Sequence, residues 1–133
     1  MAFVGKREKR AKQVNVRLNE SDAVRFQEVM DFNYHQTVSD SVRDMIRSGW
    51  RDFQNRSQRD IDKIMETVPK ESDSDTKTYQ LNVRLTAAEL GMTDFLMLKM
   101  HCKSISESIR NLINIFHVTA VEGRKGPKAR TAK

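Results

Sequence analysis

Three hydrogen-bonding side chains recur in the same order at two places in the chain. They are glutamine, asparagine and arginine, separated by single apolar residues: Gln13, Asn15 and Arg17, then Gln80, Asn82 and Arg84. Asn and Gln can make paired hydrogen bonds to the edge of adenine, and Arg can do the same to O6 and N7 of guanine. An ordinary solvent-facing strand has no need of the same three residues twice. The pattern therefore indicates contacts to the base edges of double-stranded DNA.

Two short β-strands must position these side chains. Strict alternation of polar and apolar residues over 13–18 and 80–85 is typical of a half-buried strand. The apolar set, which we expect to face the core, is Val14, Val16, Leu18, Leu81, Val83 and Leu85. If the two strands pair antiparallel, the six polar side chains share the other face. A two-stranded ribbon of this kind fits the major groove, which is about 12 Å wide.

The two strands belong to a longer internal repeat. A shift of 67 residues aligns residues 13–46 with residues 80–113 without a gap, and ten positions are identical. Two amphipathic helices are predicted after each strand. Patterns typical of helix starts stand at Asn19-x-x-Asp22, Thr37-x-x-Asp40, Thr86-x-x-Glu89 and Ser104-x-x-Glu107. An isolated strand cannot close a core, so we expect the repeats to pair within one chain. The alternative pairs like repeats between two chains.

The sequence divides into six segments. They are a basic arm (1–12), a first repeat (13–48), a connecting helix (49–68), a linker (69–78), a second repeat (79–118) and a basic tail (119–133). The connecting helix is predicted from apolar residues between Trp50 and Val68 at three- and four-residue steps. Gly49 either separates it from the preceding helix or weakens a continuous one. If the apolar stripe of segment 50–68 is exposed, it indicates a protein partner or an oligomer.

The positive charge of the chain is concentrated at its two ends. Residues 1–12 hold five Lys or Arg against one Glu, and residues 122–133 hold the same numbers, which gives +4 at each end. Because the whole chain carries +6, the middle carries −2. Basic ends of this kind are typical of arms that embrace an anionic polymer, although they also increase solubility.

No pattern typical of an enzyme, a cofactor or a metal site is present. The sequence lacks a Gly-rich phosphate loop, a Cys-x-x-Cys pair and a nucleophile elbow. His35, His101 and His117 do not combine with Cys102 at metal-ligand spacing. We therefore expect a protein that is not an enzyme and needs neither cofactor nor metal.

The sequence also predicts a cytoplasmic location. No apolar run approaches the roughly 18 residues of a membrane-spanning helix. The basic start MAFVGKREKR is not followed by the apolar stretch of a secretory signal. A single cysteine fits a reducing compartment. We expect a cytoplasmic protein associated with the nucleoid, without a membrane partner.

The pattern Gln-x-Asn-x-Arg on a short strand, followed by two capped helices, resembles the ribbon-helix-helix family of the Arc/MetJ type. The resemblance covers residues 13–47 and 80–114. It implies that the six polar strand residues contact bases. It also implies a phosphate contact at the start of each second helix, at Thr37, Val38 and Ser39 and at Ser104, Ile105 and Ser106. We add Lys12, at the end of the basic arm, to the phosphate contacts.

The family often has Gly between its two helices, whereas this chain offers only Asn33 as an obvious left-handed position. Arg43 and Arg110 recur in the second helices and either contact phosphate or pair with a nearby acid. The expected fold is mostly α with a short antiparallel β-ribbon, as a tandem ribbon-helix-helix pseudo-dimer.

The expected function is sequence-specific binding of double-stranded DNA as a transcriptional repressor, with self-association on adjacent half-sites left open. The alternatives are an accessory DNA-binding protein of the relaxosome or partition type, and an antitoxin.

Overall fold

The centre of the fold is a two-stranded antiparallel ribbon. The structure is a computed structural model that describes residues 10–34, 37–69 and 79–122. Strand β1 (Arg10–Leu18) pairs with β2 (Tyr79–Thr86), with Gln13 opposite Arg84, Asn15 opposite Asn82 and Arg17 opposite Gln80. These pairs confirm the expected antiparallel ribbon. Asn15 and Asn82 occupy equivalent positions of the repeat, so the register is symmetric about that pair.

Helices make up most of the remaining described chain, so the structure confirms a mostly helical fold with a two-stranded sheet. The helices are α1 (Glu20–Asn33), α2 (Val38–Gln54), α3 (Gln58–Glu66), α4 (Ala87–Met100), α5 (Ile105–Phe116) and the π-helical turn η2 (His117–Glu122). Each α-helix begins after a side chain that accepts a hydrogen bond from the backbone N–H three residues on, at Asn19, Thr37, Ser57, Thr86 and Ser104. Four of these caps stand where the sequence predicted them.

The first helix of each repeat ends in a left-handed residue. Tyr34 has φ 60° and His101 has φ 59°, and the two positions are equivalent in the repeat. The expectation for Asn33 was wrong, because Asn33 is the last residue of α1 and the reversal comes one residue later. The backbone N–H of Tyr34 is directed at the carbonyl groups of Asp31 and Met30, which closes the helix end.

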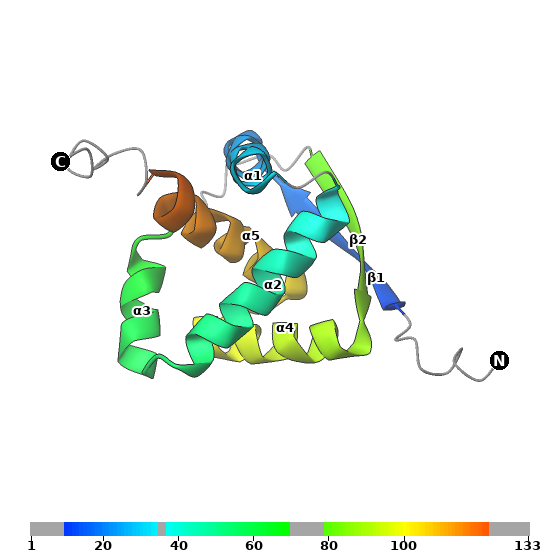
Figure 1. The fold of residues 1–133 in the computed structure, drawn as a ribbon. Coiled ribbons are helices and arrows are strands. Elements are labelled where there is room, and N and C mark those ends of the chain that lie inside the picture. The colour runs from blue at the N-terminus through cyan, green and yellow to red at the C-terminus, as the bar shows by residue number, and fades with distance from the viewer. Residues whose placement is uncertain (1–9, 35–36, 70–78, 123–133) are drawn as a thin grey trace.

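The two repeats interlock. Helix α1 of the first repeat packs against α5 of the second, and α2 packs against α4 (Figure 1). Strand β1 likewise contacts α5, while β2 contacts α2. Most of the largest fully buried apolar side chains come from the two repeats, and Ile61 of α3 joins them. They are Val16, Leu18, Val29, Met45 and Ile46, with Leu85, Leu96, Ile109, Leu112 and Ile113. The core is therefore shared between the repeats.

Segment 49–68 differs from the single connecting helix expected from the sequence. Helix α2 continues through Gly49 to Gln54, and α3 starts separately after the Ser57 cap. A Cβ atom at Gly49 would lie 3.0 Å from Cδ2 of Leu112 and 3.6 Å from Cδ2 of Leu96. Glycine is thus required by the close approach of α2 to two neighbouring helices, and it does not end the helix.

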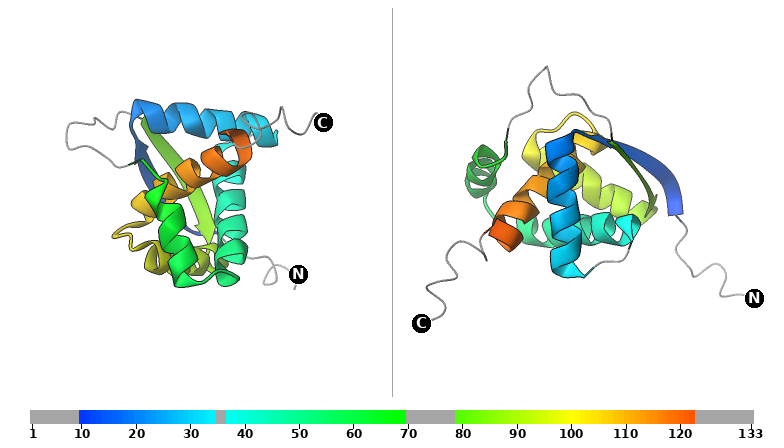
Figure 2. Two further views of the ribbon diagram at one scale, coloured as in Figure 1. Left: turned by 90° about the vertical axis from the view of Figure 1, so that its left-hand side faces the viewer. Right: turned by 90° about the horizontal axis from the view of Figure 1, so that it is seen from above.

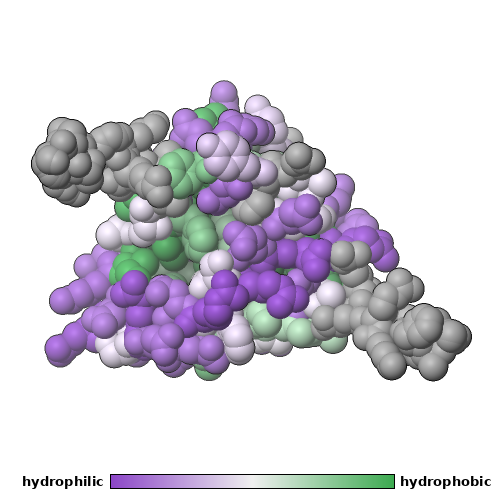
Figure 3. All heavy atoms as spheres, in the orientation of Figure 1, coloured by the Kyte–Doolittle hydropathy of each residue, from purple (hydrophilic) through white to green (hydrophobic). Residues whose placement is uncertain are grey.

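The apolar stripe of segment 50–68 is largely covered by the protein's own core. Phe53, Ile61 and Val68 are buried, while Trp50 and Ile64 are half-buried. Helix α3 lies on the side of the molecule away from the ribbon (Figures 1 and 2). Beside it, Phe53, Ile64 and neighbours from α5 line an apolar depression of about 280 Å³, visible as a green hollow in Figure 3. Among the described helices, none has the length and apolar character needed to cross a membrane.

A buried charge cluster joins the repeats. Glu89 of α4 is fully buried and faces two arginines of α2. The Nε atom of Arg43 lies 3.2 and 2.9 Å from the two carboxylate oxygens, and Nε of Arg47 lies 3.0 Å from one of them. Burial alone would raise the pKa of Glu89. Hydrogen bonds from the Thr86 N–H and from the two guanidinium groups stabilise the charged carboxylate by more than burial destabilises it. The pKa of Glu89 therefore lies below its usual range.

Two glycines give opposite predictions for helix packing. Gly49→Val should destabilise the fold by about 1–3 kcal/mol, because its side chain collides with Leu112. Gly91→Ala, where no atom lies within 4 Å of the new Cβ, should stabilise α4 by about 0.5–1 kcal/mol. Urea unfolding of both variants measures the two effects. Equal effects of the two substitutions would contradict the close approach at Gly49.

Removal of the buried carboxylate should be costly. Glu89→Ala leaves Arg43 and Arg47 without their carboxylate and should lower the free energy of unfolding by about 3–5 kcal/mol at neutral pH. Asp52→Ala, which removes only the exposed Asp52–Arg56 pair, should cost about 0.5 kcal/mol or less. Because the folded-state pKa of Glu89 is lowered, the difference should shrink as the pH falls through that value. A difference that is independent of pH in the acid range would contradict the cluster.

Candidate nucleic-acid interface

One face of the ribbon carries all six side chains that the sequence singled out. Gln13, Asn15 and Arg17 on β1 are exposed, as are Gln80, Asn82 and Arg84 on β2. Alternate residues face the opposite side, where Val14, Val16, Leu18, Val83 and Leu85 are buried and Leu81 is half-buried. The burial of one face fixes the register, because a slip by one residue would turn the polar set toward the core.

The side chains on this face are ordered by contacts with one another. Nε2 of Gln13 donates to Oδ1 of Asn15 at 3.4 Å, and the equivalent bond from Gln80 to Asn82 measures 3.0 Å. Across the ribbon, a guanidinium nitrogen of Arg84 lies 3.5 Å from Oε1 of Gln13. In each strand the Gln–Asn contact orients the two amides, which leaves further donors and acceptors for a ligand.

The starts of α2 and α5 present backbone N–H groups near the ribbon. Thr37 and Ser104 are the N-caps, and each already accepts a hydrogen bond inside its own helix. The side chains of Val38 and Ile105 pack against the core, so only their backbone can contact a phosphate. Two helix starts are thus available for anions, one in each repeat.

The start of α5 is tied directly to β1. The Oγ atom of Ser106 accepts the backbone N–H of Arg17 at 3.3 Å. One guanidinium nitrogen of Arg110 donates to the backbone oxygen of Arg17 at 3.2 Å and to Oγ of Ser106 at 3.0 Å. These bonds hold a strand residue of the first repeat against a helix of the second, and so fix the ribbon relative to the expected phosphate site.

Arg43 and Arg110 therefore differ, although the repeat makes them equivalent. Arg43 pairs with the buried Glu89, whereas Arg110 holds Arg17 and Ser106. Their recurrence in the sequence identified the positions, but it did not identify partners that lie far away in the chain.

The basic residues next to the ribbon are covered only in part by the described structure. Lys12 is exposed, beside Gln13 on β1. The strand pairing shifts between Arg10 and Lys12, which marks an irregularity at this end of the ribbon. The rest of the expected basic arm, residues 1–9, and most of the basic tail, residues 123–133, lie outside the described residues.

The remaining candidate groups have ordinary structural partners. His101 contacts Asp62 at 3.3 Å, and His117 hydrogen-bonds Glu28. Burial raises the pKa of the Cys102 thiol to about 11, which disfavours the nucleophilic thiolate. Across residues 10–34, 37–69 and 79–122, no group of three or more His, Cys, Asp or Glu side chains could hold a metal ion. His35 lies outside these ranges.

Comparison of the chain with protein-family models, with curated proteins and with solved structures gave no match.

The tie between α5 and β1 can be tested by hydrogen exchange. Ser106→Ala removes the acceptor of the Arg17 N–H and should cost about 1 kcal/mol, so exchange of that amide should accelerate by about fivefold. Ser39→Ala, at the equivalent position of the first repeat, is the control and should leave the Arg17 amide unchanged. Equal exchange at Arg17 in both variants would contradict the tie.

Proposed function

We propose that the protein binds double-stranded DNA sequence-specifically, with its β-ribbon in the major groove, and acts as a transcriptional repressor. In this proposal the chain is a tandem ribbon-helix-helix pseudo-dimer. The observation that carries it is the exposed face of the ribbon, where two Gln-x-Asn-x-Arg sets lie side by side and are symmetric about Asn15 and Asn82. All six side chains are types that hydrogen-bond base edges.

The dimensions of the ribbon support this function. Alternate residues of a strand lie about 6.6–6.8 Å apart, which is about two base steps of DNA at 3.4 Å each. Gln13 and Arg17 on β1 then span about four base steps, and so do the equivalent residues of β2. Because the register is symmetric about the central asparagine pair, we expect the DNA target to be a short inverted repeat.

Phosphate contacts complete the proposed interface. One phosphate would bind at the start of each second helix, on opposite sides of the ribbon. The donors would be the backbone N–H groups of Val38 and Ser39 in α2 and of Ile105 and Ser106 in α5. Lys12 and the basic ends of the chain would add affinity that depends on salt and is independent of sequence.

The repressor role is favoured over a partner-dependent role by the burial of segment 50–68. Phe53, Ile61 and Val68 are used in the protein's own core, so little of the apolar stripe remains for a partner. An accessory protein of the relaxosome or partition type is the second candidate, because the ribbon would read its site in the same way. Self-association on adjacent half-sites and association with the nucleoid belong to either proposal.

Removal of the central asparagines tests the proposal. A duplex is first selected from a random pool by the wild-type protein, with excess competitor DNA at near-physiological salt. The double variant Asn15→Ala, Asn82→Ala should bind this duplex more weakly, by about 1–3 kcal/mol for each asparagine that pairs with a base. Its affinity for unrelated DNA should remain, because that affinity comes from contacts to phosphate.

The control is Lys63→Ala, Glu66→Ala, which changes two exposed side chains of α3, on the side of the molecule away from the ribbon, and leaves the net charge unchanged. Circular dichroism verifies that both double variants fold. If the asparagine variant keeps its preference for the selected duplex, the ribbon does not read the bases. If the wild type selects no sequence at all, the sequence-specific function is wrong, and only binding through the basic ends remains.

A further inference from the structure

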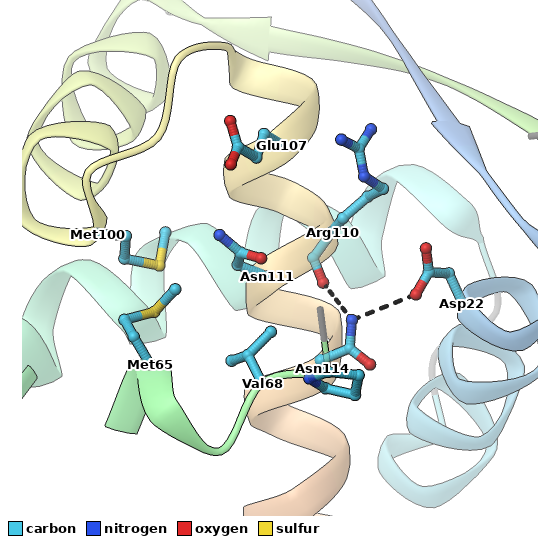
Figure 4. A pocket seen from close by; sticks show the side chains of 9 residues that line it. Asp22, Met65, Val68, Met100, Glu107, Arg110, Asn111 and Asn114 are labelled. Atoms are coloured by element: carbon cyan, nitrogen blue, oxygen red, sulfur yellow. Dashed lines mark hydrogen bonds between the residues drawn. The ribbon is translucent and has the colours of Figure 1, made fainter. Parts of the chain in front are cut away.

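A cavity of about 270 Å³ lies over α5, where the first helix of one repeat meets the second helix of the other (Figure 4). On one side Asn114 faces Asp22, and on the other Met65 and Met100 lie together (Figure 4). The remaining lining residues are Val68, Pro69, Glu107, Arg110 and Asn111. The cavity thus combines an apolar wall with carboxylate and amide groups.

The internal repeat provides a comparison for this cavity. The residues equivalent to Asp22, Arg110 and Asn114 are Glu89, Arg43 and Arg47. In that half of the molecule, both arginines contact the buried carboxylate at 2.9 Å. The site of Glu89 therefore holds two guanidinium groups packed against one carboxylate.

The Asp22 half is filled by smaller groups. Asn114 donates to Oδ1 of Asp22 at 3.2 Å. The guanidinium group on this side belongs to Arg25, whose Nη1 donates to Oδ1 of Asn114 at 3.0 Å and lies 3.6 Å from Oδ1 of Asp22. Arg110 contacts Arg17 and Ser106 at the ribbon. Asp22 is one methylene shorter than Glu89, and Asn114 is much shorter than Arg47. These shorter side chains leave space where the other half has arginine.

The charge of the cavity has a definite sign. Two carboxylates, Asp22 and Glu107, line it with one guanidinium, Arg110, so the lining carries a net charge of −1. Arg25, which is not part of the lining, adds a positive charge beside Asp22. The Asp22 carboxylate is buried, with 8% of the side chain exposed, and the guanidinium of Arg25 approaches it only to 3.6 Å. A buried carboxylate in this setting is stabilised by a further cation that brings N–H donors.

We propose that this cavity binds a small cationic ligand, a guanidinium group on a short alkyl chain. The guanidinium group would take the place that Arg47 has beside Glu89. It would donate to the carboxylate of Asp22 and to Oδ1 of Asn114, which also accepts from Arg25. The alkyl chain would lie against Met65 and Met100. The volume, below the range of about 300–1,000 Å³ for drug-sized ligands, limits the ligand to about the size of an amino-acid side chain. This proposal does not depend on DNA binding.

Titration with ethylguanidinium, followed by NMR of the full chain, tests the proposal. The side-chain amide signals of Asn111 and Asn114 should shift and saturate. Ethylurea, which has a similar shape and N–H donors but no charge, should bind at least tenfold more weakly. No saturable shift below the concentration that unfolds the protein would overturn the proposal, and so would equal binding of the two compounds.

The variant Asn114→Arg places in the cavity the side chain that the other repeat has, and should weaken ethylguanidinium binding at least tenfold. Gln54→Arg, which adds the same charge on the exposed end of α2, should leave binding unchanged. Equal binding by both variants would place the ligand elsewhere and overturn the proposal. If Asn114→Arg does not fold, Glu107→Gln removes one lining charge at nearly constant size. It should weaken binding of ethylguanidinium but not of ethylurea, and no effect would count against the site.

Discussion

The fold depends on one constraint, that neither repeat can bury its own strand and helices. A lone strand leaves its backbone groups unpaired, and its two helices cover only part of an apolar face. The chain meets this constraint by pairing β1 with β2 and by exchanging helices, so that α1 rests on α5 and α2 on α4. The ribbon therefore has one buried face and one exposed face, and the exposed face can carry side chains chosen for hydrogen bonding.

Within this shared core, the two repeats have diverged where their helices meet. One junction is closed by Glu89 with Arg43 and Arg47, while the other has shorter side chains around Asp22 and an open cavity. Arg110, the counterpart of Arg43, holds the backbone of Arg17. The exposed face of the ribbon, by contrast, keeps the same three residues in both strands. The chain thus combines a symmetric exposed face with an asymmetric interior.

The antiparallel ribbon, the face that it buries and four of the α-helix starts could be predicted from the sequence, because they follow from local patterns that occur twice. Period-two alternation predicted the strands. The capping residues predicted where four of the helices begin, at Asn19, Thr37, Thr86 and Ser104. The end of α2 could not be predicted, because glycine usually disfavours a helix, yet α2 continues through Gly49. The close packing of α2 on Leu112 requires glycine at this position. Arg43 and Arg110 look alike in sequence, and their different roles depend on partners in the other repeat. The left-handed backbone at Tyr34 and His101 could not be predicted either, because neither position has the glycine that usually marks this conformation.

The central claim, that the ribbon reads bases in the major groove, is tested most directly by changing the DNA while the protein stays intact. A duplex that the protein selects can be made with 7-deaza purines, which lack the N7 acceptor of guanine and adenine but keep normal pairing. Asn, Gln and Arg use this acceptor in their paired contacts. Readout by the ribbon predicts that affinity falls by about 1–3 kcal/mol for each contacted purine, with salt dependence unchanged. Unchanged affinity for the modified duplex would contradict it.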